Sequence, residues 1–259
     1  WSSDVCSSDL IGKIALKELF TAKRFMITMS TDVQQIGYWW NHRLWMDDES
    51  SFLLDWGEAT SEDDLMRLAH RRYDFCDDEP PMEVDTAIID SGYRAKKEGG
   101  VYNFCMKSGG KFVPSKGRGS TQGLYVPVSE GIVATGYGEE RTNLIQYRDD
   151  MLKDWLYQQT ISKRQGPGWF LPRNIDANYR QQLQDEKLLE NEDGTSEYED
   201  SGNNHLGDVE KMQFALRELL IRPLVEANRK KKEAAAKKDA EKPYQDEEGQ
   251  WKRDYVLAR

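Results

Sequence analysis

The chain has 259 residues and a formal net charge of −10, and 38% of its residues are hydrophobic. This length and hydrophobic content predict one domain of about 200 residues followed by a tail. No segment approaches the ~18 apolar residues of a transmembrane helix, so we expect a soluble cytoplasmic protein. The three cysteines (Cys6, Cys76 and Cys105) are too few for a disulfide framework or a cysteine-based zinc site.

The acidic balance bears on the class of partner. A generic DNA coat protein would be basic, so a net charge of −10 argues against that class. It does not exclude an enzyme that acts on DNA. Metal-binding carboxylates and the acidic segment 184–200 add negative charge, while local lysines and arginines can still contact phosphates.

The first ten residues, WSSDVCSSDL, match codon by codon the translation of a common sequencing-library adapter. We therefore expect residues 1–10 to be an artefact without a role in the fold. A native leader is the alternative, but the segment has neither a basic start nor a long apolar stretch.

Hydrophobic periodicity predicts the elements in chain order. Strands are expected at 24–31, 38–45, 51–56, 84–89, 111–114 and 142–147, with a hairpin insertion at 124–137. Helices are expected at 61–69, 95–106, 151–161 and 206–225, and a turn with a short extended segment at 165–172. Residues 181–203 should be helical at first and mobile after Glu190, and the charged run from Asn228 should continue as a solvated helix. This order favours an α/β domain of the RNase H-like kind, with a mixed central sheet flanked by helices.

Three aspartates lie where such a fold could gather them. Asp32 and Asp90 each end a short apolar run, so they should emerge at strand ends, and Asp208 begins an amphipathic helix. Carboxylates from two strands and one helix can bind hard divalent cations. Alone, each could simply cap an element. Three carboxylates ~4 Å apart repel by about 4 kcal/mol per pair at an effective dielectric of 20, so a cluster persists most readily around a cation.

Basic residues near these positions suggest contacts with phosphate. Lys116 and Arg118 lie in a Gly-rich loop at 116–123, which could approach phosphate closely or could be a flexible surface loop. Asp150 begins the helix that contains Lys153. It is either an acidic residue favoured by the helix dipole or an accessory metal ligand.

The remaining titratable residues are weaker candidates. We expect Asp149 to face solvent. His205 precedes Asp208 by three residues and is expected either beside the site or as a helix-end cap. His42 and His70 are too dispersed to form a zinc set with it.

Six short motifs occur in one order between about residues 25 and 225. They are Asp32-Val-Gln34, Asp90-Ser-Gly92, Ser115-Lys-Gly117, Asp150-Met-Leu-Lys153, Gly166-Pro-Gly168 before an aromatic-Pro strand, and Asn204-His-Leu-Gly-Asp208. Together they resemble the nuclease domain of the large terminase subunit of tailed phages, of the lambda-like, GpA type, which cuts concatemeric DNA during packaging. Gly207 replaces an apolar residue of the family pattern, and Asp149 blurs which aspartate matches at 150.

The resemblance implies an RNase H-like nuclease domain at 24–227 that hydrolyses double-stranded DNA with two Mg²⁺ or Mn²⁺ ions. Its metal ligands would be Asp32, Asp90 and Asp208, with Asp150 as an accessory, and its DNA-binding residues would be Lys116, Arg118 and Lys153. The implied partners are the small terminase subunit, the portal protein and an ATPase domain of the same natural polypeptide, in the host cytoplasm.

The family's ATPase motif, Gly-x-x-x-x-Gly-Lys-[Ser/Thr], does not occur in the chain. We therefore expect residues 11–23 to be the remnant of a linker from a missing ATPase domain, and 228–259 to be a charged, portal-docking tail. Two alternatives remain open at this point. One is another RNase H-like phosphotransferase, such as a junction resolvase or a transposase, and the other is a catalytically silent packaging module.

Overall fold

The computed structural model describes residues 23–75, 80–92, 100–119, 124–136, 139–160, 167–190, 196–199, 202–240, 244–245 and 251–252. Within these ranges, no helix is long and apolar enough to span a membrane.

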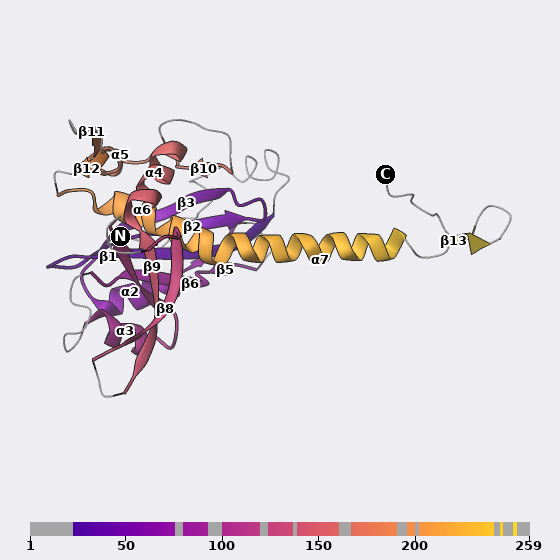
Figure 1. Cartoon of the computed structure of the whole chain (residues 1–259), viewed down its shortest axis with the longest axis horizontal. Helices are drawn as coiled ribbons and strands as arrows, with labels where there is room; N and C mark the ends of the chain where they lie inside the picture. Colours follow the sequence, from indigo (N-terminus) through magenta and orange to yellow (C-terminus); the bar gives the residue numbers. More distant parts are fainter. Residues whose placement is uncertain are drawn as a thin grey trace.

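An eight-stranded sheet forms the centre of the molecule, in the order β10-β3-β2-β1-β6-β7-β9-β8 (Figure 1). Its strands are β1 (Arg24–Val33), β2 (Tyr38–Met46), β3 (Ser51–Ala59), β6 (Thr86–Asp90), β7 (Phe112–Arg118), β8 (Val128–Ala134), β9 (Arg141–Arg148) and β10 (Trp169–Phe170). An antiparallel meander, β1 to β3, precedes β6, β7 and β9, which run parallel to β1. The predicted α/β fold with a mixed central sheet is confirmed.

Helices cover both faces of this sheet. They are α2 (Glu62–Ala69), α3 (Val101–Lys107), α4 (Asp149–Thr160), α5 (Ala177–Leu183), α6 (His205–Leu216), the π-helical turn η3 (Arg217–Ile221) and α7 (Arg222–Ala240). Because side chains alternate along a strand, neighbouring residues of β6 enter different cores. Ile89 packs in the cluster that contains α2 and α3, and Ile88 packs in the cluster under α4, α5 and α6.

The shorter strands form three pairs outside the central sheet. These are β4 (Arg72–Tyr73) with β5 (Met82–Glu83), β11 (Lys187–Glu190) with β12 (Ser196–Glu199), and β13 (Tyr244–Gln245) with β14 (Trp251–Lys252).

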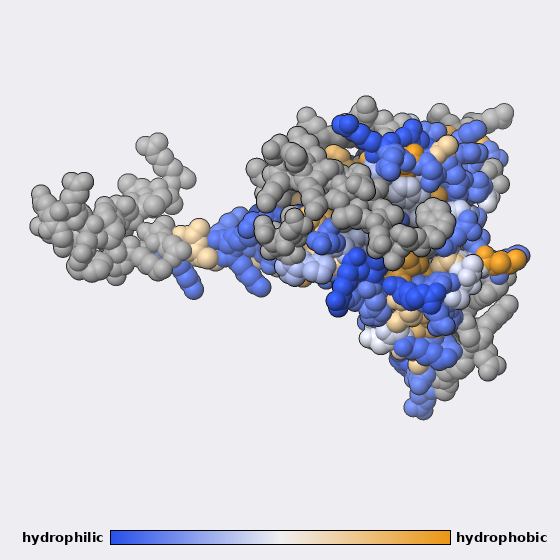
Figure 2. Space-filling view, turned by 180° about the vertical axis from the view of Figure 1, so that it is seen from behind, coloured by the Kyte–Doolittle hydropathy of each residue, from blue (hydrophilic) through white to orange (hydrophobic). Residues whose placement is uncertain are grey.

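The last helices run from the core into solvent. Helix α6 is buried almost all round and packs across β1 and β2. It continues through η3 into α7, which extends from the body as an arm (Figure 1). Residues 226–238 of that arm are exposed, and its surface is mostly hydrophilic (Figure 2). The expected solvated helix after Asn228 is therefore present as far as Ala240.

The structure corrects several predicted elements. Residues 116–118 belong to strand β7 rather than to a loop, and 120–123 lie outside the described residues. The region 124–137 is not a hairpin by itself, because β8 is a single edge strand paired with β9. Residues 196–199, expected to be mobile, form β12 opposite β11. Helix α3 begins at Val101. Residues 93–99 and the N-terminal segment 1–22 lie outside the described residues.

Candidate active site

Asp32, Asp90 and Asp208 all line one pocket of about 360 Å³ at the end of the central sheet. The parallel register between β1 and β6 aligns Thr31 with Ile89, so the carboxyl ends of both strands lie side by side. Asp32 and Asp90 follow directly. The sequence thus brings two carboxylates to one sheet edge through strand pairing alone.

Helix α6 brings the third carboxylate. The hydroxyl of Ser30, two residues before Asp32, donates a hydrogen bond of 2.6 Å to the carbonyl of Val209. Both atoms are buried, so this bond fixes the first turn of α6 against β1. Asp208 lies in that turn, next to Val209, and therefore faces the ends of the strands.

Two side chains hold Asp32. The amide of Gln34 donates to its Oδ2, and Nδ1 of His205 lies 3.1 Å from the same oxygen. The His205 ring stacks on Trp39, with 5.8 Å between ring centroids. His205 therefore lies beside the pocket, which is one of the two places that the sequence left open for it.

Asp90 carries the clearest electrostatic signature of the pocket. Burial raises the pKa of its carboxyl to about 6, against a hydrogen bond of 3.0 Å from the backbone N–H of Gly92, which lowers it. The negative charges of Asp32 and Asp208 raise the pKa further. All three carboxylates therefore act on one another through the pocket.

Asp208 lies at the end of a chain of ion pairs. Nζ of Lys211 lies 2.6 Å from carboxylate oxygens of both Asp208 and Asp149. Burial raises the pKa of Asp208, and Lys211 opposes that rise. Although burial alone would lower the pKa of Lys211, the two carboxylates raise it well above its usual value. Lys211 is therefore a buried cation at the wall of the pocket. It was not among the site residues predicted from the sequence.

The structure corrects one expectation for the start of α4 and bears on a second. Asp149, expected to face solvent, lines the pocket and pairs with Lys211 and Lys153. These lysines hold the pKa of Asp149 below its usual value even though burial opposes the shift. Asp150, for which an ordinary helix-start position and an accessory metal role were both left open, pairs with Arg148 and is not among the residues that line the pocket. The sequence could not separate two adjacent acidic residues at a helix start.

The three expected DNA-binding residues fall in different environments. Lys116 lines the pocket. Nε of Arg118 donates to Gln146 on the neighbouring strand at 3.0 Å. Lys153 is only 11% exposed and pairs with Asp149 at 3.2 Å and with Glu186 at 2.5 Å. Lys116 is thus presented to a ligand in the pocket, whereas Lys153 is engaged inside the protein.

The donor atoms fit a hard divalent cation. Asp32, Asp90 and Asp208 offer only carboxylate oxygens, which Mg²⁺ and Mn²⁺ prefer. In the described part of the chain, no group of three or more His, Cys, Asp or Glu side chains lies close enough together to hold a metal ion as it stands. Each carboxylate is instead turned toward its own donor: Gln34 and His205, Gly92 or Lys211.

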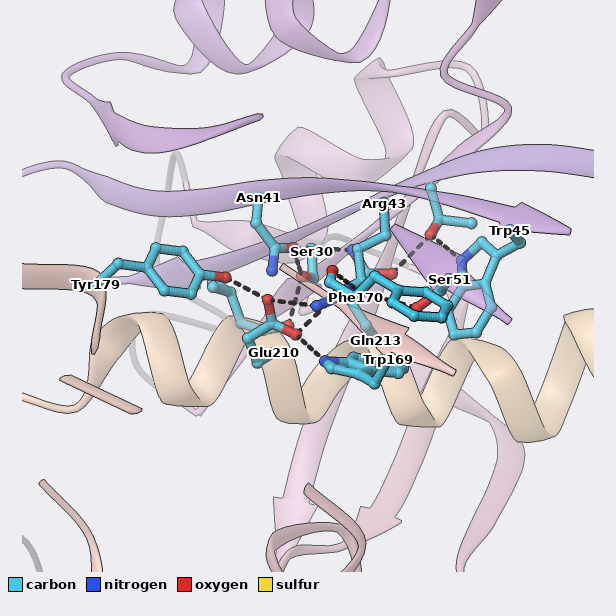
Figure 3. A network of polar contacts seen from close by, with 12 residues as sticks. Ser30, Asn41, Arg43, Trp45, Ser51, Trp169, Phe170, Tyr179, Glu210 and Gln213 are labelled. Atoms are coloured by element: carbon cyan, nitrogen blue, oxygen red, sulfur yellow. Dashed lines mark hydrogen bonds and ion pairs between the residues drawn. The ribbon is translucent and has the colours of Figure 1, made fainter. Parts of the chain in front are cut away.

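A buried ion pair holds α6 in place (Figure 3). Arg43 in β2 and Glu210 in α6 form two hydrogen bonds of 2.9 and 3.1 Å, and both side chains are fully buried. Trp169 donates from Nε1 to Glu210 at 2.9 Å, and the Arg43 guanidinium lies 3.8 Å from the centroid of the same ring system. Tyr179 donates to Glu210 as well. No sequence signal links Arg43 with a residue 167 positions away.

A family model for the terminase large subunit gpA endonuclease domain matches residues 16–228. The chain belongs to this family. No curated protein matches it. Among solved structures, the chain is similar to a mutant nuclease domain of the large terminase subunit gp2 of bacterial virus Sf6, solved with manganese. That similarity covers 76% of this chain and 92% of the other, with 13% identity and a TM-score of 0.45.

Proposed function

We propose that this gpA-type nuclease domain is a divalent-metal-dependent endonuclease that cleaves concatemeric double-stranded DNA during phage genome packaging. One observation carries the proposal. Three aspartates from two strands and one helix line a single pocket, where burial and, to a lesser degree, the charges of Asp32 and Asp208 raise the pKa of Asp90. Burying such repelling carboxylates together is unfavourable unless a cation neutralises them in use.

Asp32, Asp90 and Asp208 would hold two Mg²⁺ or Mn²⁺ ions. When bound, the ions would supply activation of a water molecule and charge stabilisation of the leaving oxygen of the phosphodiester. Gln34 and His205 orient the Asp32 carboxylate.

Two basic residues of the pocket, Lys211 and Lys116, have separate roles. Lys211 pairs with Asp208 and Asp149 and opposes the rise that burial causes in the pKa of both carboxyls. Lys116, in the pocket lining, is placed to contact a DNA phosphate. Asp150 is committed to Arg148, so we assign it no metal.

Packaging partners would decide where the domain cuts. The small terminase subunit, the portal protein and the ATPase domain of the natural polypeptide are the partners that the family implies. The domain itself should cut with little sequence preference, because its pocket offers carboxylates and two lysines for a phosphodiester rather than a surface shaped for base edges.

Incubation of the purified chain with supercoiled plasmid and Mn²⁺ tests the proposal. We expect nicking that EDTA abolishes, that Asp32→Ala lowers at least a hundredfold, and that Asp63→Asn leaves unchanged. Asp63 is an exposed carboxylate on α2 and serves as the matched control.

Calorimetry adds a readout that does not need turnover. Mn²⁺ binding should be abolished by Asp90→Asn and kept by Asp150→Asn. Absence of both nicking and Mn²⁺ binding by the wild-type chain would contradict the proposal. Cleavage confined to four-way junctions would instead indicate a junction resolvase.

A further inference from the structure

The β1–β2 hairpin ends in a turn that presents one apolar side chain to solvent. Ile36 is 95% exposed, the highest value among the large hydrophobic residues that the structure describes as exposed. Tight turns favour Gly, Asn, Asp and Ser, so neither turn formation nor packing explains a β-branched residue here. An isolated exposed hydrophobic residue is common on proteins, and its place in the fold decides whether it matters.

The turn is held in one shape. The backbone N–H of Gln34 donates to the carbonyl of Gly37 at 3.1 Å, which leaves Gln35 and Ile36 at the tip. Gly37 has a φ of +89°, and a Cβ at this position would lie 2.7 Å from the carbonyl oxygen of Ala59. Only glycine therefore fits. The glycine packs the hairpin against β3 and aims the tip outward.

The tip follows closely in the chain on Asp32, which lines the pocket. Ile36 follows Asp32 by four residues, which is at most ~13 Å along an extended strand. Gln34, the first residue of the turn, also donates its side-chain amide to Asp32. The hairpin projects beyond the end of the sheet on this side (Figure 1). Lys116 lines the pocket from β7, two strands away from β1 in the sheet order.

We propose that Ile36 inserts into the minor groove of the duplex held for cleavage and so positions the scissile phosphate at the aspartates. This inference rests on the proposed nuclease function. It deepens that function by assigning a residue for duplex positioning that makes no contact with the reacting atoms.

An apolar side chain at the tip of the hairpin suits insertion into the minor groove of DNA. Proteins that bind the minor groove commonly insert Ile, Leu, Phe or Met between base steps. The groove is ~6 Å wide, which suits a single side chain beside a glycine better than a broad surface. The contact is apolar, so it adds affinity without base-specific hydrogen bonds, as a packaging nuclease of low sequence preference requires.

The test measures affinity for a fluorescent 30-base-pair duplex and for a single strand of the same sequence, in Ca²⁺ to limit cleavage. Ile36→Ala should weaken duplex binding about tenfold, the loss expected for an apolar side chain that is no longer buried. Ile36→Asp should weaken it more, and Ile36→Met should restore it. Single-strand affinity should stay within about twofold, because a single strand has no minor groove. A minor-groove-binding drug should weaken the wild-type complex and not that of Ile36→Ala.

Ile132→Ala is the matched control, because Ile132 is 67% exposed on the edge strand β8. Unchanged duplex affinity in both Ile36→Ala and Ile36→Asp overturns the inference, as does an equal loss for the single strand or for Ile132→Ala. If the wild-type chain nicks plasmid while these variants bind normally, only the groove contact fails. If the wild-type chain neither nicks nor binds DNA, the proposed function fails with it.

Discussion

Asp90 shows, at the scale of one residue, that a negative charge buried in the pocket is unfavourable. Burial raises the pKa of its carboxyl from 3.8 to about 6, and Asp32 and Asp208 add to the rise. Between these two pH values the folded chain binds more protons than the unfolded chain. The contribution of Asp90 to stability is therefore present below pH 3.8 and is lost as the pH rises through about 6.

Replacing Asp90 by Asn should accordingly stabilise the metal-free protein at pH 7.5. We expect the free energy of unfolding in EDTA to rise by about 1–3 kcal/mol, because the buried charge is removed. Chemical denaturation at pH 5 and pH 7.5 measures this, and the gain should be smaller at pH 5. Mn²⁺ should stabilise the wild type and not the Asn variant. An Asn variant no more stable than the wild type at pH 7.5 would show that the charge of Asp90 does not destabilise the metal-free protein.

Lys211 should have the opposite effect on stability. Its ammonium is buried between Asp149 and Asp208, so Lys211→Met leaves Asp208 without a cation and Asp149 with Lys153 alone. The loss in EDTA at pH 7.5 should be about 3–5 kcal/mol. Thermal unfolding measures it, with the exposed Lys231→Met as control. Mn²⁺ should restore part of the loss. Equal unfolding temperatures for the two variants would exclude a structural role for the Lys211 ion pairs.

At the scale of elements, the position of helix α6 determines where Asp208 lies in the pocket. Besides apolar packing, it makes buried polar contacts with β1 and β2: Thr28 donates to Gln213, Ser30 to Val209 and Arg43 to Glu210. These bonds are directional, so they fix the rotation of α6 about its axis more closely than apolar packing would. The rotation decides where Asp208 points.

The Arg43–Glu210 pair should therefore couple stability to metal binding. Arg43→Met and Glu210→Leu should each lower the free energy of unfolding by about 3–5 kcal/mol, because each leaves one buried charge unpaired. The double variant should lose less than the two single losses together. Each single variant should also weaken Mn²⁺ binding, since Glu210 follows Asp208 by two residues. Additive losses in a double-mutant cycle measured by urea denaturation would contradict this coupling.

The buried polar contacts of α6 also mark the limit of what could be predicted from the sequence. Periodicity located β1, β2, β3 and β9 closely, and the motifs around Asp32, Asp90 and Asp208 predicted residues that do line one pocket. The sequence predicts a strand at 24–31, but it does not show that α6 covers the polar side chains of β1 and β2. Such burial depends on pairings between residues more than 160 positions apart, which no local pattern contains.

A second limit on prediction is that the sequence does not distinguish between neighbouring residues of the same type. Asp149 and Asp150 are equivalent in any reading of local sequence, and only the packing of α4 against Lys211 separates them. The same holds for the Gly-rich segment after Ser115. Pairing with β9 extends β7 through Arg118, although the glycines there favour a loop.

At the scale of the whole molecule, charge is divided between an acidic body and a basic arm. The chain carries a net charge of −10, whereas α7 contains seven basic and three acidic residues. The arm is anchored at its start, where Arg217 and Arg222 both bond to Glu49 in the turn between β2 and β3. Beyond that point Lys232 pairs with Asp47, both on the surface.

Truncation after Asn228 should therefore separate the nuclease from the arm. Residues 229–238 are exposed, and the ion pair lost with Lys232 is a surface pair, so the free energy of unfolding should fall by less than about 1 kcal/mol. Plasmid nicking should persist, because the pocket and the Glu49 contacts remain. Binding to the portal protein should weaken, as the resemblance of the tail to a docking element implies, and deletion of 240–259 alone should weaken it too. Surface plasmon resonance with immobilised portal rings, run beside the nicking assay, measures both outcomes. Nicking lost with portal affinity unchanged would show that the arm serves the active site instead.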